Sequence, residues 1–436
     1  MSRRNLNLLL AISIVSFACY KKADSAYRSH YGRMFGTFVE VLSQIDAHYV
    51  EEVDDRDLFE GALTGMVGRL DPYSAYIPPA ESTEFRESLD QQFGGIGIEV
   101  SWDPQTKLLT VLSPLVGSPA YEAGILAGDK ILLIDGESTE GFNIQDAVQR
   151  LRGQPGEPVR LTVLHEGDTR PVDIELKRAI IEVDTVLGDT RAPDGSWNFF
   201  LNDTKIGYIR VVGFGERTTS ELQGALAHLA REKAEGLVLD LRYNAGGLLK
   251  SATSTADLFL ERGRIVSTRG RDQTDREVFE ASGNAPYPDL PLVVLMNRFS
   301  ASASEVVAAC LQDHGRAAVV GERSFGKGTV QNVIPLEEGK SVLKLTIATY
   351  WRPSDRNIDR GKNAKEEDAW GVTPNPGLEV KLTDEELRRV VEERRQRDVV
   401  RRPGSAQSVQ TDPPFDPQLQ KAIDYLKQKL GTTKAE

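Results

Sequence analysis

Three closely spaced serines and a lysine downstream of them are the residues of this chain best suited to chemistry. Ser300, Ser302 and Ser304 alternate with alanines in the segment 297–305, and Lys327 lies further along between two glycines. A serine hydroxyl is a weak nucleophile at neutral pH, so an enzyme that uses one needs a neighbouring base, usually histidine but in some hydrolases an uncharged lysine. The pattern suggests a serine nucleophile with a lysine base.

A lysine can act as a base only if its pKa is lowered toward the working pH. Burial in an apolar site disfavours the ammonium form and can lower the pKa by up to ~3–5 pKa units from about 10.4. Phe325 lies two residues before Lys327, and Val330 lies three residues after it. We therefore expect the Lys327 amine to turn into an apolar site.

The serines lie where an apolar run gives way to a helical pattern. Residues 291–296 have the length of a buried strand, and residues from about Ser304 to Gly315 have apolar positions at helical spacing with glycine as the stop. A strand-to-helix turn leaves the first helical N–H groups unpaired, where they can stabilise an oxyanion. The alternative is that the serines are only turn and N-cap residues, with Glu305 in an acidic first turn.

A second glycine-rich segment strengthens the catalytic interpretation. The apolar run 236–241 predicts a strand, and residues 242–247 (Arg-Tyr-Asn-Ala-Gly-Gly) predict a loop whose backbone can approach a ligand closely. The amides of this loop are candidate oxyanion donors. An ordinary turn after a strand is the alternative.

These segments together resemble the C-terminal processing peptidases, also called tail-specific proteases. Residues 239–249 are similar to the strand-and-loop signature of that family. Residues 300–309, followed by 312–316 and 320–331, are similar to its catalytic signature. The resemblance covers nearly the whole interval from the serines to the lysine, and it implies a serine endopeptidase.

The resemblance implies a role for each catalytic position. Ser302 matches the nucleophile, Lys327 the general base, and Gln331 the group that orients the lysine. On a strand Lys327 and Gln331 would share one face, because side chains repeat with period two. A glutamine carbonyl can hold an amine by a neutral hydrogen bond without raising its pKa as a carboxylate would.

The oxyanion donors are also implied by the resemblance. They are the amide of Ala303 and one amide of the pair Gly246 and Gly247. Asp313 matches a position important in some members, and its place near a helix end suggests scaffolding. The glycine loop departs from the common family form in having Tyr243 and Ala245 where asparagine and proline are usual, which affects the expected stiffness of the loop.

A histidine-dependent serine hydrolase is the competing chemistry. The chain has five histidines: His30, His48, His165, His228 and His314. Only His314 lies near either signature, and it falls where the helix after Ser302 should end, a common place for a cation. We expect a structural role for it.

Residues 92–178 resemble a PDZ domain of the bacterial protease type. The loop with Gly95, Ile96 and Gly97 would bind a terminal carboxylate through its backbone amides, while the neighbouring strand edge pairs with an extended peptide. Residues 144–151 predict a short helix along the groove. A phosphate cradle is the alternative, but neither a Gly-Lys-Ser/Thr nor a dinucleotide-binding spacing is present.

The resemblance implies that the PDZ module also acts as a gate over the catalytic cleft. Arg178, at the exit of the module, matches an arginine that contacts the active site in some members. The structural alternative is a solvated surface arginine.

The N-terminus predicts export. Arg3 and Arg4 precede an apolar stretch at 6–20 that is followed by two lysines, as in a secretory signal. It could be cleaved or remain as a membrane anchor, and a buried N-terminal helix is the alternative. We expect a periplasmic or cell-envelope protein.

The remaining patterns complete the domain plan. The fold class expected is a multidomain α/β protein, with a crotonase-like spiral core implied by the resemblance, an inserted PDZ β-sandwich, and helical segments at both ends. Helical periodicity covers 34–70 with a break near 53–55, and a final helix is expected at about 418–430. The boundaries expected are a signal peptide or anchor at 1–26, a helical region at 27–91, the PDZ domain at 92–178, the protease core at 179–382, and a C-terminal helical region with a linker (399–414) at 383–436.

Composition limits the partners. The formal net charge of -12 and the lack of a basic stripe argue against nucleic acid. Cys310 is expected to be a small core residue and Cys19 lies in the leader, so no disulfide framework is implied. We expect no cofactor or metal. The expected partners are proteins with exposed apolar C-termini, with a homodimer possible; a PDZ adaptor without catalysis is the alternative function.

Overall fold

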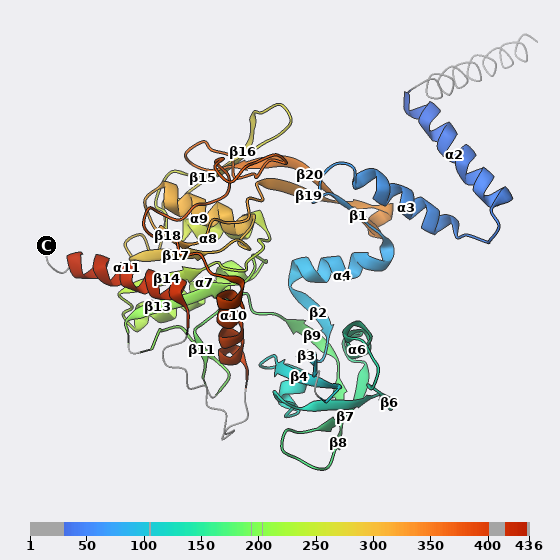
Figure 1. Ribbon diagram of the computed structural model, residues 1–436, viewed down its shortest axis with the longest axis horizontal. Coiled ribbons are helices and arrows are strands. Elements are labelled where there is room, and N and C mark those ends of the chain that lie inside the picture. The colour runs from blue at the N-terminus through green and yellow to red at the C-terminus, as the bar shows by residue number, and fades with distance from the viewer. Residues whose placement is uncertain (1–29, 104–105, 193, 203, 401–414, 434–436) are drawn as a thin grey trace, which may run out of the picture. The chain divides into compact units, whose positions relative to one another are not determined.

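The computed structural model describes residues 30–103, 106–192, 194–202, 204–400 and 415–433 (Figure 1). The chain divides into two compact units: residues 1–78 with 333–345, and residues 79–332 with 346–436. The expected leader with Cys19, and all but the first two residues of the expected linker, lie outside the described residues. Within the described ranges no helix is long and apolar enough to cross a membrane.

The first unit contains the two helices expected between residues 34 and 70. Helix α2 (His30–His48) and helix α3 (Asp55–Val67) are separated by a short break, which confirms that prediction. Strand β1 (Ala75–Ile77) pairs antiparallel with the beginning of β20 (Ser341–Trp351). Large apolar side chains of the two helices are exposed, among them Met34, Phe35, Val39 and Met66.

The second unit begins with helix α4 (Pro79–Asp90) and a β module with its own core. Its main sheet has the order β3-β4-β5-β7-β8, with β6 added to β5, and a separate ribbon joins β2 to β9. The helix expected at 144–151 is present as α6. The bounds are β2 (Gln92–Gly95), β3 (Ile98–Asp103), β4 (Leu108–Pro114), α5 (Pro119–Glu122), β5 (Lys130–Ile134), β6 (Glu137–Ser138), α6 (Ile144–Leu151), β7 (Pro158–Leu164), β8 (Val172–Lys177) and β9 (Ala179–Glu182).

A mainly parallel sheet forms the centre of the remaining part. Its order is β10-β13-β14-β17-β18, and all pairs except the antiparallel β10–β13 are parallel. The parallel strands are fully buried, as expected for apolar runs covered on both faces. The bounds are β10 (Val186–Leu187), β13 (Ile206–Val211), α7 (Thr218–Arg231), β14 (Gly236–Asp240), α8 (Leu249–Asp257), β17 (Leu292–Met296), α9 (Ala303–Asp313) and β18 (Ala318–Gly321).

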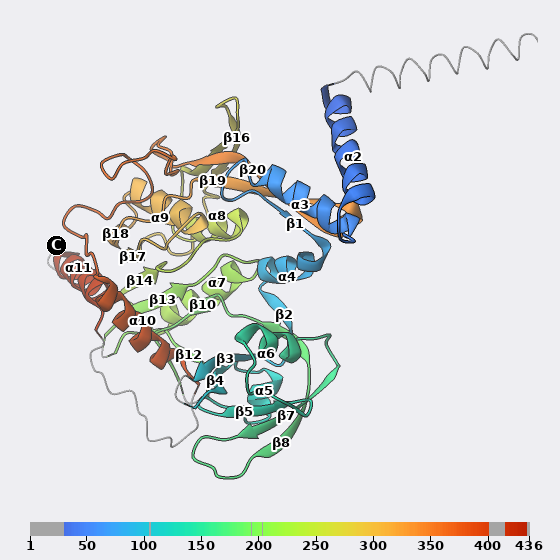
Figure 2. The same cartoon turned by 45° about the vertical axis from the view of Figure 1, so that its right-hand side comes forward.

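Helices cover both faces of this sheet, which confirms the α/β class. On one face α7, α8 and α9 enclose the largest apolar cluster. On the other face lies the final helix α11 (Pro417–Thr433) (Figures 1 and 2). It buries Leu419, Ala422 and Leu426 against side chains of β13, β14, β17 and β18. The helix expected at about 418–430 is therefore present as α11 and forms part of the core.

The other elements are a second antiparallel group, a short ribbon and helix α10. Strand β15 pairs with β16 and with the end of β20, and β19 also pairs with β20. The bounds are β11 (Thr190–Arg191), β12 (Trp197–Asn198), β15 (Arg264–Arg269), β16 (Asp275–Glu280), β19 (Thr329–Leu336), the 3₁₀ turn η1 (Glu337–Gly339) and α10 (Asp384–Asp398).

Candidate active site

Ser302 lies at the turn between strand β17 and helix α9. Its backbone has φ +57° and ψ -116°, a conformation that is unfavourable for a residue with a side chain and that is often found at functional sites. The residue is only 5% exposed. The amide of Ala303 is the first N–H of α9 and has no acceptor within the helix. The strand-to-helix turn predicted from the sequence is thus present.

The two flanking serines hold the turn in place. The Ser300 hydroxyl donates to the Leu241 carbonyl (2.9 Å), and the Ser304 hydroxyl donates to the Asn244 carbonyl (2.9 Å). Ser302 instead lies beside Tyr350; burial raises the pKa of the Tyr350 phenol to about 12, against a smaller lowering effect from Ser302. The hydroxyls of Ser300 and Ser304 therefore hold backbone carbonyls at or next to the glycine loop.

The glycine loop at 242–247 packs directly on Ser302. Gly246 has φ +107°, and a Cβ atom there would lie 2.8 Å from the Ser302 Cβ and 3.1 Å from the Ala303 nitrogen. The Gly246 amide donates to Asn244 Oδ1 (2.8 Å), so it is engaged within the loop. Of the two glycine amides expected as oxyanion donors, that of Gly246 thus already has an acceptor, which leaves that of Gly247 as the candidate to act with the Ala303 amide.

One buried carboxylate joins the serine and lysine segments. Glu305 Oε2 accepts the amides of both Ser302 and Lys327 (2.8 Å each), while Oε1 accepts the Gly326 amide (2.8 Å) and the Ser324 hydroxyl (2.5 Å). Burial raises the pKa of Glu305 to about 7, against the lowering effect of these hydrogen bonds. The sequence placed Glu305 only in an acidic first turn; the bridging role was missed because the partners are distant in sequence.

Lys327 lies in a tightly packed segment just before strand β19. A Cβ atom on Gly326 would lie 2.8 Å from the Trp370 ring, and one on Gly328 would lie 2.1 Å from the Asp359 nitrogen. The Lys327 side chain is partly buried. These glycines fix the path of the backbone that carries the predicted base.

Gln331 lies inside β19, which begins at Thr329, so the expectation that Lys327 is also on the strand is wrong. The Gln331 side-chain amide donates to Thr329 Oγ1 (2.8 Å) and to Thr346 Oγ1 (3.2 Å). Both bonds use the nitrogen of the amide and orient its carbonyl.

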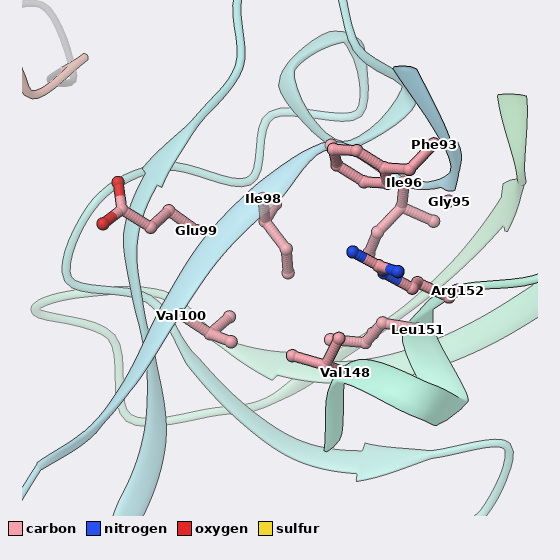
Figure 3. Close-up of a pocket in the computed structure, with 10 residues that line it drawn as sticks. Phe93, Gly95, Ile96, Ile98, Glu99, Val100, Val148, Leu151 and Arg152 are labelled. Atoms are coloured by element: carbon pink, nitrogen blue, oxygen red, sulfur yellow. The ribbon is translucent and has the colours of Figure 1, made fainter. Parts of the chain in front are cut away.

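The β module contains a groove between strand β3 and helix α6. It has a volume of about 250 Å³ and includes the predicted binding residues Gly95, Ile96 and Gly97. Figure 3 shows apolar side chains from β3 and α6 along it, with Arg152 at one end. The lining residues are Phe93, Gly95, Ile96, Gly97, Ile98, Glu99, Val100, Val148, Leu151 and Arg152.

Arg178 lies within the β module, where it binds the end of α6. Its guanidinium donates to the carbonyls of Arg150 (2.6 Å), Leu151 (3.3 Å) and Pro158 (2.8 Å), and its side chain is 9% exposed. It is therefore not the solvated surface arginine of the structural alternative. These partners, and Glu157 at 4.0 Å, belong to the module that forms the groove and not to the serine and lysine segments.

Asp313 and His314, at the end of α9, both have structural partners. The Asp313 carboxylate makes a bidentate ion pair with Arg352 (2.5 and 2.9 Å), as expected for a scaffolding residue. The His314 ring contacts the Arg264 carbonyl (2.8 Å) at the C-cap of the helix. Cys310, on the same helix, is fully buried in the core, and burial raises the pKa of its thiol to about 12. Within the described ranges no group of histidine, cysteine and acidic side chains could hold a metal ion.

Comparisons with protein families give three matches along the chain. Residues 205–375 match "Peptidase family S41", residues 110–164 match "PDZ domain", and residues 18–80 match "Activating protease CtpB N-terminal domain". The first match contains Ser302, Lys327 and Gln331. The second covers most of the β module.

Individual relatives extend the similarity over nearly the whole chain. The carboxy-terminal-processing protease of Bartonella bacilliformis is 38% identical over 413 residues, covering 91% of this chain and 89% of that protein. The carboxyl-terminal-processing protease of Synechocystis is 37% identical over 303 residues, covering 69% and 68%. The solved structure titled photosystem II D1 C-terminal processing protease has 29% identity and a TM-score of 0.45, covering 82% of this chain and 88% of that one. The chain therefore belongs to the carboxy-terminal-processing proteases of peptidase family S41, serine-type peptidases, and it carries a PDZ domain.

Proposed function

We propose that the protein is an exported serine endopeptidase that binds the C-terminal tails of other proteins in its PDZ groove and cleaves their peptide bonds with a Ser302–Lys327 dyad. The observation that carries the proposal is the single Glu305 carboxylate that accepts both the Ser302 and the Lys327 amides at 2.8 Å. This carboxylate holds the backbone of Ser302, the proposed nucleophile, and of Lys327, the proposed base. Both residues lie in the segment that matches peptidase family S41.

The reaction follows from the chemistry of these groups. Lys327, as the neutral amine, takes the Ser302 hydroxyl proton while Oγ attacks the scissile carbonyl carbon. The amides of Ala303 and Gly247 stabilise the resulting oxyanion. The lysine proton then passes to the leaving amine as the C–N bond breaks, and water hydrolyses the acyl-enzyme by the same steps. Gln331 orients the Lys327 amine with its carbonyl oxygen.

The groove of the PDZ domain supplies the substrate preference. The amides of the loop at Gly95, Ile96 and Gly97 would bind the terminal carboxylate, and the apolar lining of Figure 3 suits an apolar last side chain. Arg178 would couple the occupied groove to turnover through its bonds to the end of α6. The substrates would be unfolded or partly processed proteins.

The remaining expectations are part of the same proposal. The protein would lie in the periplasm or cell envelope, either released from the segment 1–26 by cleavage or held to a membrane by it, and would have no nucleic-acid partner. Exposed apolar side chains on α2 and α3 favour a homodimer. The protease core would follow the crotonase-like spiral.

The test compares the protein with Ser302→Ala on an unfolded protein substrate that ends in an apolar residue. Mass spectrometry should find new internal cleavages with the unchanged protein and none with the variant, while both bind a peptide of the substrate tail. Binding without cleavage by either protein would support a PDZ adaptor and overturn the proposed activity.

A further inference from the structure

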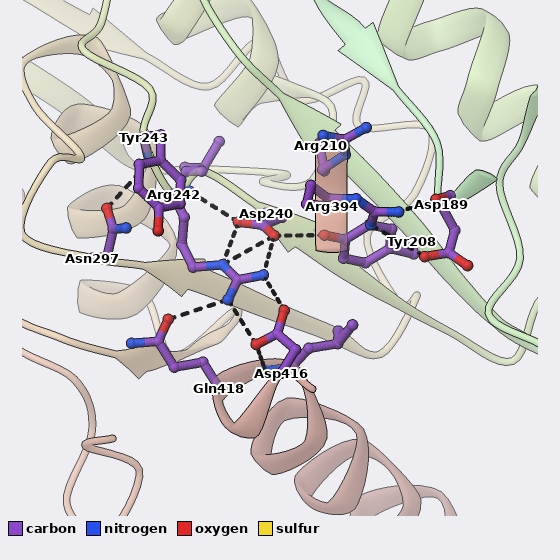
Figure 4. A network of polar contacts seen from close by, with 12 residues as sticks. Asp189, Tyr208, Arg210, Asp240, Arg242, Tyr243, Asn297, Arg394, Asp416 and Gln418 are labelled. Atoms are coloured by element: carbon purple, nitrogen blue, oxygen red, sulfur yellow. Dashed lines mark hydrogen bonds and ion pairs between the residues drawn. The ribbon is translucent and has the colours of Figure 1, made fainter. Parts of the chain in front are cut away.

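The final helix contacts the glycine loop that packs on Ser302. The guanidinium of Arg242, the first residue of that loop, donates to Asp416 Oδ1 (2.9 Å) and Oδ2 (2.8 Å). It also donates to Gln418 Oε1 (3.2 Å). Figure 4 shows the guanidinium between the Asp240 carboxylate and the first turn of α11.

The contact is buried, which makes it strong. Only 4% of the side chain of Arg242, 4% of Asp240 and 11% of Asp416 is exposed. Asp240 accepts three hydrogen bonds from the guanidinium (2.7, 3.0 and 3.1 Å) and one from the Tyr208 hydroxyl (2.7 Å). Charge-assisted, bidentate hydrogen bonds in a buried site fix the orientation of the arginine closely.

The loop that begins at Arg242 is hydrogen-bonded to the residues on both sides of Ser302, the proposed nucleophile. Asn244, two residues on, accepts the Ala301 amide (2.9 Å) and the Ser304 hydroxyl (2.9 Å) with its carbonyl. Its side chain accepts the Gly246 amide and donates to the Val211 carbonyl (2.7 Å). A shift of the start of the loop would therefore move the backbone on both sides of the oxyanion site.

Asp416 is itself held on a rigid element. Its Oδ1 caps α11 by accepting the Leu419 amide (3.0 Å), and Leu419 is buried in the core below the sheet. Gln418 is fully buried and its amide donates to the Val380 carbonyl (2.9 Å). Side chains fixed in this way can hold catalytic groups in position without contacting the substrate themselves.

We propose that Asp416 and Gln418 are positioning residues for peptide-bond cleavage: from the last helix they hold Arg242, and through Arg242 the loop that carries the oxyanion donor. This inference rests on the proposed function. It predicts that the catalytic step depends on the C-terminal helix although no residue of that helix is part of the catalytic set.

The test is Asp416→Asn in the full-length chain. Asparagine keeps the helix cap but loses the charge and one of the two acceptor oxygens. The kcat for an unfolded substrate with an apolar C-terminus, corrected for the folded fraction, should fall by about 10- to 100-fold because the oxyanion donors lose their position. KM and the affinity of the PDZ groove for a tail peptide should stay within about twofold, the scatter of context effects.

Two further variants separate positioning from folding. Asp416→Glu keeps the charge and should retain more activity than Asp416→Asn, and Asp424→Asn, at an exposed position of the same helix, should match the unchanged protein. An unchanged kcat per folded molecule in Asp416→Asn would overturn the positioning role. If the unchanged protein itself fails to cleave while Asp424→Asn and the parent are folded, the proposed function fails instead.

Discussion

Glu305 unites a structural and an electrostatic role in one side chain. Its two oxygens accept four hydrogen bonds, from the amides of Ser302, Gly326 and Lys327 and from the Ser324 hydroxyl. A carboxylate can accept all four, whereas a protonated carboxyl must offer one oxygen as a donor toward groups that are donors themselves. The catalytic geometry therefore requires the ionised form, while burial favours the neutral form.

A pH dependence of stability follows from Glu305. Since burial raises its pKa from 4.5 to about 7, the folded state holds a proton that the unfolded chain has lost between these values. The contribution of this group to the free energy of unfolding is thus present below pH 4.5 and lost as the pH rises through about 7. Relative to Glu305→Gln, the parent should lose about 3 kcal/mol between these limits in denaturant titrations. Parallel curves for both proteins would contradict this.

The flanking serine offers a milder prediction. Ser304→Ala removes the hydrogen bond to the Asn244 carbonyl and leaves a buried acceptor with one partner fewer. The free energy of unfolding should fall by about 1–2 kcal/mol, and cleavage should weaken without disappearing. Complete loss of cleavage in a folded Ser304→Ala protein would contradict a purely supporting role for Ser304.

At the scale of elements, the strand-turn-helix around Ser302 and the glycine loop after β14 form one packed unit. Gly246→Ala would place a Cβ atom 2.8 Å from the Ser302 Cβ and would force alanine into φ +107°. Cleavage should fall by at least about 100-fold, since small displacements at a catalytic centre have effects of that size. Gly224→Ala in α7 is the control, because nothing lies within 4 Å of the new Cβ; it should stabilise the helix slightly and leave the rate unchanged.

These local elements are the part of the molecule that the sequence predicts best. The strand expected at 291–296 is β17, and the helix expected from about Ser304 to Gly315 is α9. Each of these elements comes from an unbroken run of residues, so the apolar pattern within that run is enough to predict it. The prediction that Lys327 lies on a strand is wrong, because β19 begins only at Thr329. Just before it, Gly326 and Gly328 pack against Trp370 and Asp359, a contact between distant residues that local spacing does not predict.

At the scale of the whole chain, long-range contacts escape prediction. The apolar spacing of the last helix predicts a helix, but its docking on the central sheet and the pairing of Asp416 with Arg242 depend on residues far apart in sequence. The same is true of Glu305 and Lys327. The family resemblance supplied the expected catalytic positions because it carries information about the three-dimensional structure that local spacing lacks.

If the PDZ groove binds the substrate's C-terminal carboxylate, the cleavage rate should depend on that carboxylate. Two unfolded substrates that differ only in a free or an amidated C-terminus should differ about 10- to 100-fold in kcat/KM, because the amide loses charge-assisted bonds to the loop at residues 95–97. Val148→Asp, on the groove side of α6, should lower both rates to a similar level. Equal kcat/KM values for the two substrates with the parent enzyme would show that the groove does not recognise the terminal carboxylate.

The most direct test of the dyad compares Lys327→Ala with His314→Ala on the same unfolded substrate, after both variants are shown to be folded. The His314 ring, at the end of α9, contacts the Arg264 carbonyl of β15 (2.8 Å), a structural role, so its variant should keep most of the activity. Lys327→Ala should lose cleavage by at least about 100-fold, as expected when a general base is removed. Cleavage that survives in Lys327→Ala and disappears in His314→Ala would contradict the Ser302–Lys327 dyad.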